Sequence, residues 1–160
     1  DLESALYDAN ILVSKRGNGY DYYLRGKTNY WSDNFDAAIS DFTQCIQKEV
    51  NKAESYYNIG YSNYAQSNWS QSIKNFNNAI DLFKDNGDLG STLSDSYRGR
   101  ALSNFEIGEK SKAISDITNA IKYDKKNGLL YLNRGTFFYR MNRMKKACKD
   151  LFYAKHLGPI

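Results

Sequence analysis

The sequence contains very little proline, cysteine and histidine. Its 160 residues include one proline, Pro159, two cysteines and one histidine, His156. Turns must therefore be built mostly from Asn, Gly, Asp and Lys. A lone histidine without clustered cysteine or carboxylate partners does not form a metal site, and it leaves serine and cysteine without a nearby base. We expect no catalytic residues, no metal and no cofactor.

Long apolar runs and phosphate-binding motifs are also absent. No apolar run approaches the ~20 residues that a membrane-spanning helix needs, and no signal-peptide pattern opens the sequence. The loops GxxxxGK and GxGxxG, which cradle phosphates, do not occur. We therefore expect no membrane span, no small-molecule substrate and no enzymatic activity.

One pattern of residues occurs four times. It begins in the stretch YYLRGKTNYWSDNFDAAISDFTQCI, which starts at Tyr22. Its small residue recurs at spacings of 34, 41 and 34 residues, at Gly26, Gly60, Ala101 and Gly135. A second small position follows at Cys45, Ala79, Ala120 and Ala154. Bulky apolar residues stand at Phe42, Phe76, Ile117 and Leu151.

These positions predict pairs of closely packed helices. A glycine within a helix costs up to about 1 kcal/mol relative to alanine, so its recurrence indicates that another helix approaches closely there. The bulky residues are then expected to fill the space between units. One such unit cannot bury its apolar face alone, so neighbouring units must stack.

A period of 34 residues with this content resembles the tetratricopeptide repeat, a helix–turn–helix unit. The resemblance covers about nine tenths of the chain. It implies an all-α fold, a right-handed superhelical solenoid of helix-turn-helix repeats. The family usually has an aromatic residue where this chain has Asn29, Asn63 and Asn104. We expect these three side chains to form hydrogen bonds between packed helices, with ligand contact as the alternative.

We predict a single repeat domain whose parts are divided as follows. Residues 1–16 are a partial repeat or leading helix, 20–51 repeat one, 53–84 repeat two, 85–91 an insertion, 92–127 repeat three and 128–160 repeat four, the terminal one. The leading segment fits either the remainder of a longer array or a native N-terminal cap, and the sequence leaves both open.

The two cysteines occupy predicted packing positions. Cys45 and Cys148 lie about three repeats apart, too far for a disulfide within one chain. We expect both to be structural thiols, which fits a reducing, cytoplasmic compartment. The compartment itself stays unassigned, because the sequence starts at Asp1 without a methionine and export is therefore not excluded.

Family resemblance also implies a binding site. In tetratricopeptide repeat proteins the first helices line a concave groove that holds an extended peptide or a partner helix. By register, that groove comprises Tyr23, Lys27, Tyr57, Asn58, Tyr61, Arg98, Leu102, Leu132, Asn133 and Thr136. Tyrosine suits recognition because its large ring has a polar tip and few torsions to freeze. The alternative is that these rings only pack between neighbouring helices.

Charge is distributed unevenly along the chain. Residues 121–160 carry ten Lys and Arg against Asp124 and Asp150, a net +8, whereas the first 120 residues carry a net −4. The predicted basic patch consists of Arg140, Arg143, Lys145, Lys146 and Lys149. Such a patch would steer an acidic partner. Nucleic acid is not the expected partner, since the charge is confined to one end and lies largely on a second helix, away from the groove.

Acidic residues also recur. Asp41, Asp116 and Asp150 occupy one repeat position, which we interpret as solvation of the helix surface or pairing with Lys and Arg. Taken together, the sequence predicts a non-enzymatic protein–protein interaction scaffold that binds a peptide or helix of a partner, an acidic one included. One alternative is a self-associating structural module of a larger protein, in which the N-terminal helix stacks on another copy. The other is binding of RNA or an anionic surface through the basic C-terminal repeat.

Overall fold

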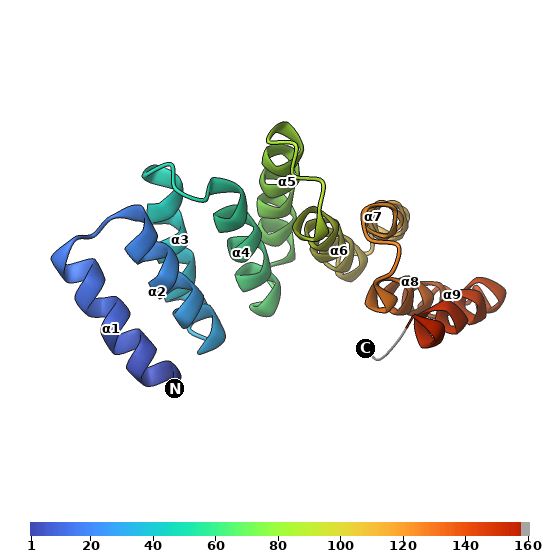
Figure 1. Cartoon of the computed structure of the whole chain (residues 1–160). Coiled ribbons are helices and arrows are strands. Elements are labelled where there is room, and N and C mark those ends of the chain that lie inside the picture. Colours follow the sequence, from blue (N-terminus) through green and yellow to red (C-terminus); the bar gives the residue numbers. More distant parts are fainter. Residues whose placement is uncertain (158–160) are drawn as a thin grey trace. The chain divides into compact units, whose positions relative to one another are not determined.

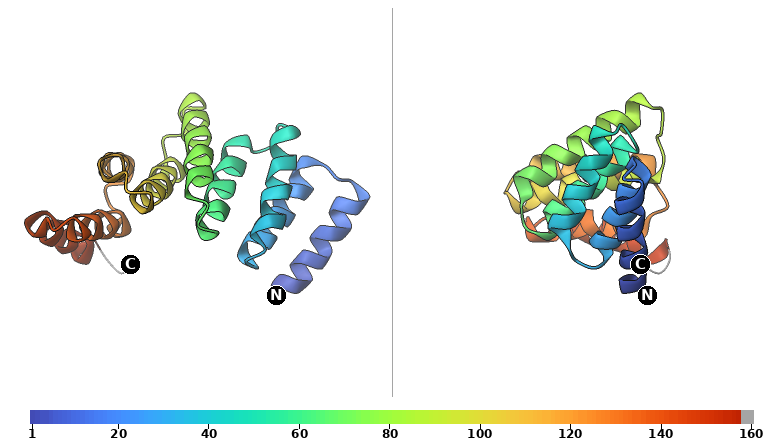
Figure 2. Two further views of the ribbon diagram at one scale, coloured as in Figure 1. Left: turned by 180° about the vertical axis from the view of Figure 1, so that it is seen from behind. Right: turned by 90° about the vertical axis from the view of Figure 1, so that its left-hand side faces the viewer.

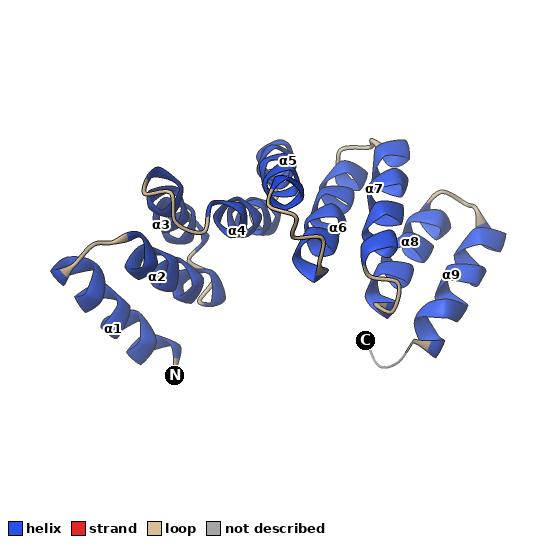
Figure 3. Cartoon of the chain, turned by 45° about the horizontal axis from the view of Figure 1, so that its top comes forward, coloured by secondary structure: helices blue, strands red, loops and turns tan. Residues whose placement is uncertain are grey.

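The computed structural model describes residues 1–157, and within them the chain forms nine α-helices and no strand (Figure 3). The helices are α1 (Leu2–Lys15), α2 (Gly19–Trp31), α3 (Phe35–Gln47), α4 (Lys52–Ala65), α5 (Trp69–Asp85), α6 (Ser91–Glu106), α7 (Lys110–Tyr123), α8 (Gly128–Arg140) and α9 (Met144–His156). Pro159 and the rest of 158–160, the end of predicted repeat four, lie outside the described residues. The predicted all-α fold is confirmed.

These helices belong to two compact units, residues 1–82 and 83–160, and α5 runs from one into the other. In the first unit α1 to α4 pack in chain order, each helix against the next (Figures 1 and 2). In the second unit α6 packs on α7 and α8 on α9, and α7 contacts α8 (Figure 1). We call α2, α4, α6 and α8 the first helices of the pairs, and α3, α5, α7 and α9 the second helices.

Each turn inside a helix pair contains one residue in the left-handed conformation. These residues are Asp33, Ser67, Gly108 and Asn142, with φ angles of 58°, 61°, 86° and 56°. After each one, the next amide donates a hydrogen bond to a carbonyl near the end of the first helix, as from Asn34 to Asn29 at 2.8 Å. Glycine tolerates this conformation because it lacks Cβ, and Asp and Asn because their short side chains bond locally. Proline is not needed to end these helices.

Glycines mark where the two helices of a pair touch. A Cβ atom on Gly60 would lie 2.8 Å from Cε1 of Phe76, and one on Gly26 would lie 3.0 Å from Cε1 of Phe42. Both distances are shorter than ordinary van der Waals contact. The prediction that small residues let the helices nest is therefore confirmed.

The bulky residues between repeats differ in burial. Phe42, Phe76 and Ile117 are fully buried, and Phe42 packs against Ile59 of the following helix pair. Leu151, however, is 38% exposed, so the prediction that it fills space between units is wrong. Within residues 1–157 no helix follows α9 to cover it.

The cysteines differ in the same way. Cys45 is buried and Cys148 is exposed, and both are free thiols. Cys148 lies on α9, as Leu151 does. Because Cys148 is exposed there, the prediction that it is a packing thiol is wrong. Burial raises the pKa of the Cys45 thiol to about 11.

Candidate binding surfaces

The first helix of the first pair carries two aromatic side chains with a lysine on the turn between them. On α2, the Lys27 ammonium lies 5.8 Å from the ring centre of Tyr23 and 4.9 Å from the ring centre of Trp31. Trp31 is 58% exposed. A cation held over two aromatic faces is attracted by their electron-rich surfaces. The sequence prediction included Tyr23 and Lys27 but missed Trp31, although its spacing of one further helical turn was the available signal.

Two tyrosines of α4 form a matching cluster. The rings of Tyr57 and Tyr61 meet edge to face at 5.1 Å, and Tyr61 lies 4.9 Å from Phe76 of α5. On the first pair, Tyr23 contacts Phe42 in the same edge-on manner at 5.9 Å. All three tyrosines are only partly buried. Each ring therefore packs on the core and also leaves part of its surface accessible.

Tyr23 of α2 and Asn58 of α4 adjoin each other in the first unit. Burial, together with the nearby Glu54 carboxylate, raises the pKa of Tyr23, and a hydrogen bond with Asn58 opposes that shift. The Asn58 amide also donates to the Glu54 carbonyl oxygen at 2.8 Å. The Tyr23 hydroxyl is therefore protonated at neutral pH. We name the surface formed by Tyr23, Lys27, Trp31, Tyr57, Asn58 and Tyr61 the α2–α4 face.

In the second unit, the corresponding predicted residues are not aromatic. Arg98 pairs with Asp95 on the preceding turn of α6, at 2.5 Å. Leu102, Leu132 and Asn133 are half-buried, and the exposed Thr136 donates its hydroxyl to the Leu132 carbonyl oxygen. The side-chain amide nitrogen of Asn133 is buried without a hydrogen-bond partner among the described residues. The aromatic character of the predicted groove thus belongs to the first unit.

A buried ion pair joins the two helices in three of the pairs. The pairs Arg25–Asp41, Arg100–Asp116 and Arg134–Asp150 have N–O distances of 2.7, 2.6 and 2.7 Å. The aspartate side chains are between 3% and 8% exposed. The predicted pairing with arginine is confirmed, and the alternative of surface solvation is wrong, because each carboxylate lies between two helices.

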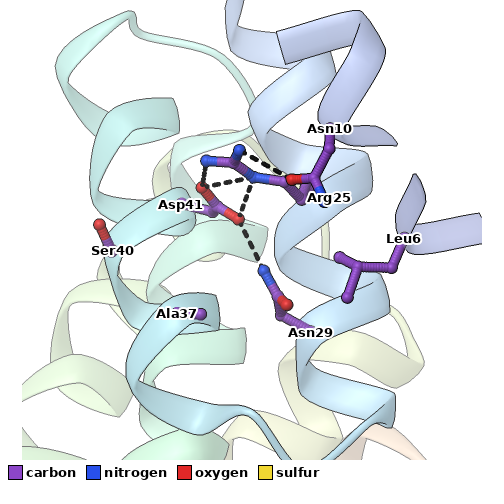
Figure 4. Close-up of a pocket in the computed structure, with 7 residues that line it drawn as sticks. All are labelled: Leu6, Asn10, Arg25, Asn29, Ala37, Ser40 and Asp41. Carbon is purple, nitrogen blue, oxygen red and sulfur yellow. Dashed lines mark hydrogen bonds and ion pairs between the residues drawn. The ribbon is translucent and has the colours of Figure 1, made fainter. Parts of the chain in front are cut away.

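Asparagines complete this network. Asn29 and Asn104 each donate a hydrogen bond of 3.0 Å to the buried aspartate of their own pair (Figure 4 shows the first). Asn63 instead donates to the Ile59 carbonyl oxygen of its own helix. The predicted hydrogen bonding between packed helices is thus confirmed for Asn29 and Asn104, and it is wrong for Asn63, whose bond stays within α4. In repeat two, Ile59 and Asn75 occupy the positions of the arginine and the aspartate.

The predicted basic patch falls into two parts. The Arg140 guanidinium contacts the Glu106 carboxylate at 3.0 Å and lies 4.6 Å from the ring centre of Phe105. The other four cations gather at the start of α9, where all are exposed, at Arg143, Lys145, Lys146 and Lys149. We call these four residues the α9 cations.

Residues 54–86 match the family model of the tetratricopeptide repeat. No curated protein matches the chain. A crystal structure of MamA aligns with a TM-score of 0.83 at 21% identity, over 98% of this chain and 88% of that chain. MamA from Desulfovibrio magneticus RS-1, residue 41 to its end, gives 0.84 at 13%, over 98% and 85%.

A further aligned structure is YrrB, described as a tetratricopeptide repeat protein with an unusual peptide-binding site. Its TM-score is 0.76 at 15% identity, over 99% of this chain and 78% of that chain. The chain has the tetratricopeptide repeat fold. Its helix pairs are therefore repeats of that fold.

A tetratricopeptide repeat scaffold is typically non-catalytic. Within residues 1–157 no three His, Cys, Asp or Glu side chains are grouped so that they could hold a metal ion. His156 packs against the Phe152 ring at 4.0 Å, and its Nδ1 lies 2.8 Å from the Phe152 carbonyl oxygen. No helix of the described part of the chain combines the length and apolar content that crossing a membrane requires.

Proposed function

We propose that this chain is a non-enzymatic protein-interaction scaffold whose α2–α4 face holds a peptide or helix of a partner protein. The observation that carries the proposal is the Tyr23–Lys27–Trp31 ladder, because Trp31 is 58% exposed beside a cation rather than packed in the core. Tryptophan and tyrosine are among the side chains that contribute most to the energy of protein recognition. The tetratricopeptide repeat fold supports the same conclusion.

Partner binding would use three kinds of contact on this face. The ring of Trp31 offers apolar area to a side chain of the partner, while the Lys27 ammonium attracts a carboxylate. The neutral Tyr23 hydroxyl and the Asn58 amide supply hydrogen bonds for a peptide backbone. Tyr23, Lys27 and Trp31 lie on successive turns of α2, about 5.4 Å apart along the helix axis. This spacing suits a ligand that contacts the helix through several of its side chains.

The first helices of the second unit offer a separate, less aromatic stretch. Leu102 and Leu132 provide partly exposed aliphatic surface, and Arg98 provides a cation. We propose that this stretch contributes to the same function.

A peptide-library selection tests the proposal. Peptides selected on the wild-type chain are measured by isothermal titration against a Lys27→Ala, Trp31→Ala variant. Loss of an aromatic anchor and its cation should weaken binding about 30-fold. Tyr7→Ala is the matched control, because Tyr7 is an exposed aromatic residue on α1, outside the face, and its removal should change affinity less than about twofold.

Circular dichroism must show that both variants keep the helical content of the wild type. Selected peptides that bind the Lys27→Ala, Trp31→Ala variant as tightly as the wild type would refute the α2–α4 face as the site. A second candidate function is self-association through α1, favoured by its exposed Leu2 and Tyr7. Light scattering over a dilution series tests it, since a monomer at every concentration contradicts it.

A further inference from the structure

A groove runs between α8 and α9, away from the predicted first-helix site. Its cavity of about 530 Å³ is lined by Tyr131, Arg134, Phe138, Lys146, Lys149, Asp150 and Tyr153, which we call the α8–α9 groove. Tyr131 and Tyr153 meet at one end with their ring centres 5.7 Å apart. At the other end the Lys146 ammonium lies 5.5 Å from the ring centre of Phe138. The Arg134–Asp150 ion pair lies between these two ends along both helices.

Repeat one also has a cavity at this position, but different side chains line it. Between α1, α2 and α3 a cavity of about 280 Å³ surrounds the Arg25–Asp41 ion pair (Figure 4). Asn29, Ala37 and Ser40 line it there. By repeat register their places in repeat four are taken by Phe138, Lys146 and Lys149. The terminal repeat has therefore exchanged one polar and two small side chains for an aromatic ring and two cations.

The charge in the α8–α9 groove is not neutralised within the described chain. Asp150 pairs with Arg134 through two hydrogen bonds, of 2.7 and 2.8 Å. Lys146 and Lys149 form no ion pair with any of residues 1–157 and are exposed. The groove therefore keeps two uncompensated positive charges beside three aromatic rings.

Lys146 also stands at the unfavourable end of its helix, in the first turn of α9. The first turn of α9 contains no acidic residue, although the N-terminus of a helix carries partial positive charge and favours anions. In α7, by contrast, Lys112 pairs with Glu109 at the helix start, 3.3 Å away. Arg143 occupies the place of Glu109 in repeat four. This arrangement works against the stability of α9, and such local violations are typical of functional sites.

We propose that the α8–α9 groove binds an acidic peptide segment of another protein. Glutamate or aspartate carboxylates of that segment would pair with Lys146 and Lys149. An apolar or aromatic side chain between them would pack on the rings of Phe138 and Tyr153, since a cavity of this size accepts side chains or small ligands. Because the groove carries two uncompensated positive charges, we expect an acidic ligand. The groove is concave and lined by aromatic rings, which favours a peptide, whereas a nucleic acid backbone requires a broad basic surface.

This site is separate from the proposed first-helix site. Tyr131, Arg134 and Phe138 form one stripe of α8, whereas Leu132, Asn133 and Thr136 lie between them in sequence on other sides of the same helix. The α2–α4 face belongs to the other compact unit. Binding in the α8–α9 groove therefore neither requires nor excludes binding at the α2–α4 face.

Calorimetric titration of the whole 160-residue chain with a short blocked peptide tests the proposal. The probe is acetylated and amidated Glu-Glu-Phe-Glu-Glu, and its uncharged control is Gln-Gln-Phe-Gln-Gln. We expect saturable binding of the glutamate peptide at low salt and at least about tenfold weaker binding of the glutamine peptide. Amide signals of Tyr131, Phe138 and Tyr153 should shift in a two-dimensional NMR spectrum during the titration.

Two double variants that lose the same net charge test whether the peptide binds in the groove. Lys146→Ala with Lys149→Ser installs the repeat-one side chains and should weaken binding of the glutamate peptide about tenfold or more. Lys126→Ala with Lys155→Ser removes the same net charge from exposed positions outside both the groove and the predicted basic patch, and affinity should stay within about twofold. Equal circular dichroism spectra show that both variants are folded.

Four results would overturn the proposal. Equal weakening in both double variants would show general charge attraction, and equal binding of both peptides would show that acidity is not recognised. Absence of saturable binding of the glutamate peptide up to about 1 mM would mean that the groove has no useful affinity. Tighter binding of a single-stranded RNA, lost on Lys146→Ala with Lys149→Ser, would assign the groove to nucleic acid instead.

Discussion

The ion pair between α2 and α3 can be tested with residues that the chain itself uses elsewhere. Repeat two has Ile59 and Asn75 at the positions of Arg25 and Asp41. The perturbation is therefore Arg25→Ile, Asp41→Asn and the two together, a double-mutant cycle that copies repeat two into repeat one. Its purpose is to measure how far the buried charges depend on each other.

The structure sets the expected size of each step. Asp41 is 2% exposed and accepts from Arg25 at 2.7 and 3.0 Å and from Asn29 at 3.0 Å. Arg25→Ile leaves that carboxylate buried with one donor, and the free energy of unfolding should fall by about 3–5 kcal/mol. In Asp41→Asn the Arg25 side chain, which is 25% exposed, still reaches water, so the loss should be about 1.5–3 kcal/mol.

The double variant should lose less than the sum of the single variants. Replacing a buried ion pair by an apolar side chain and a neutral amide removes both desolvated charges together, and such replacements are often close to neutral. We expect a total loss below about 2 kcal/mol and therefore a coupling energy of at least about 2.5 kcal/mol. Asn29 would then hydrogen-bond a neutral amide in place of a carboxylate.

Urea unfolding provides the assay. Fluorescence of Trp31, which lies on α2 itself, is followed together with circular dichroism, and their midpoints must coincide before free energies are compared. Removing Trp69 by Trp69→Phe in all four proteins makes the fluorescence specific to α2. If the two single losses add to within about 0.5 kcal/mol, the ion pair contributes no coupling and this reasoning is refuted.

Three further predictions concern packing, thiol reactivity and pH. A Cβ on Gly60 would meet the buried Phe76 ring at 2.8 Å, so Gly60→Ala should lower the free energy of unfolding, measured in urea, by about 1–2 kcal/mol. The control is Gly135→Ala, because the leucine next to Gly135 is partly exposed. Equal losses in the two variants would contradict the packing argument. At pH 8 a thiol reagent should label Cys148 quickly and Cys45 only after unfolding. Burial raises the pKa of the Cys45 thiol to about 11, so its contribution to stability is complete below the unfolded pKa, about 8.5, and is lost as the pH rises through the folded value. Relative to Cys45→Ala, the wild type should lose about 2–3 kcal/mol over that range; parallel pH profiles of the two proteins would exclude the effect.

Sequence periodicity predicted the fold because its determinants are local or repeated. Helix formation depends on residues within a few positions of each other, and the recurring glycine positions show where helices must touch. Gly60 and Phe76, for example, identify a close helix contact from spacing alone, and the structure confirms it. The asparagines were assigned to hydrogen bonding for the same reason, since Asn29, Asn63 and Asn104 recur at one position.

Other features depended on neighbours that the sequence does not place. Asp41 reads as a surface residue along its own helix, but its partner Arg25 lies 16 residues earlier on another helix, and only packing buries the pair. Trp31 was not among the predicted groove residues, because its exposure beside Lys27 is a property of the folded helix surface and the repeat pattern does not mark it.

Whether a side chain is buried is a property that the structure determines and the repeat position alone does not. Leu151 occupies the same repeat position as Phe42 yet is 38% exposed, because burial requires a covering helix and sequence position does not provide one. The sequence by itself determined the repeat, the helix pairs and the type of scaffold, since these follow from local periodicity. Only the tertiary structure decided which charges are buried, which rings are exposed and where uncompensated cations meet a cavity, because those properties arise from contacts between distant parts of the chain.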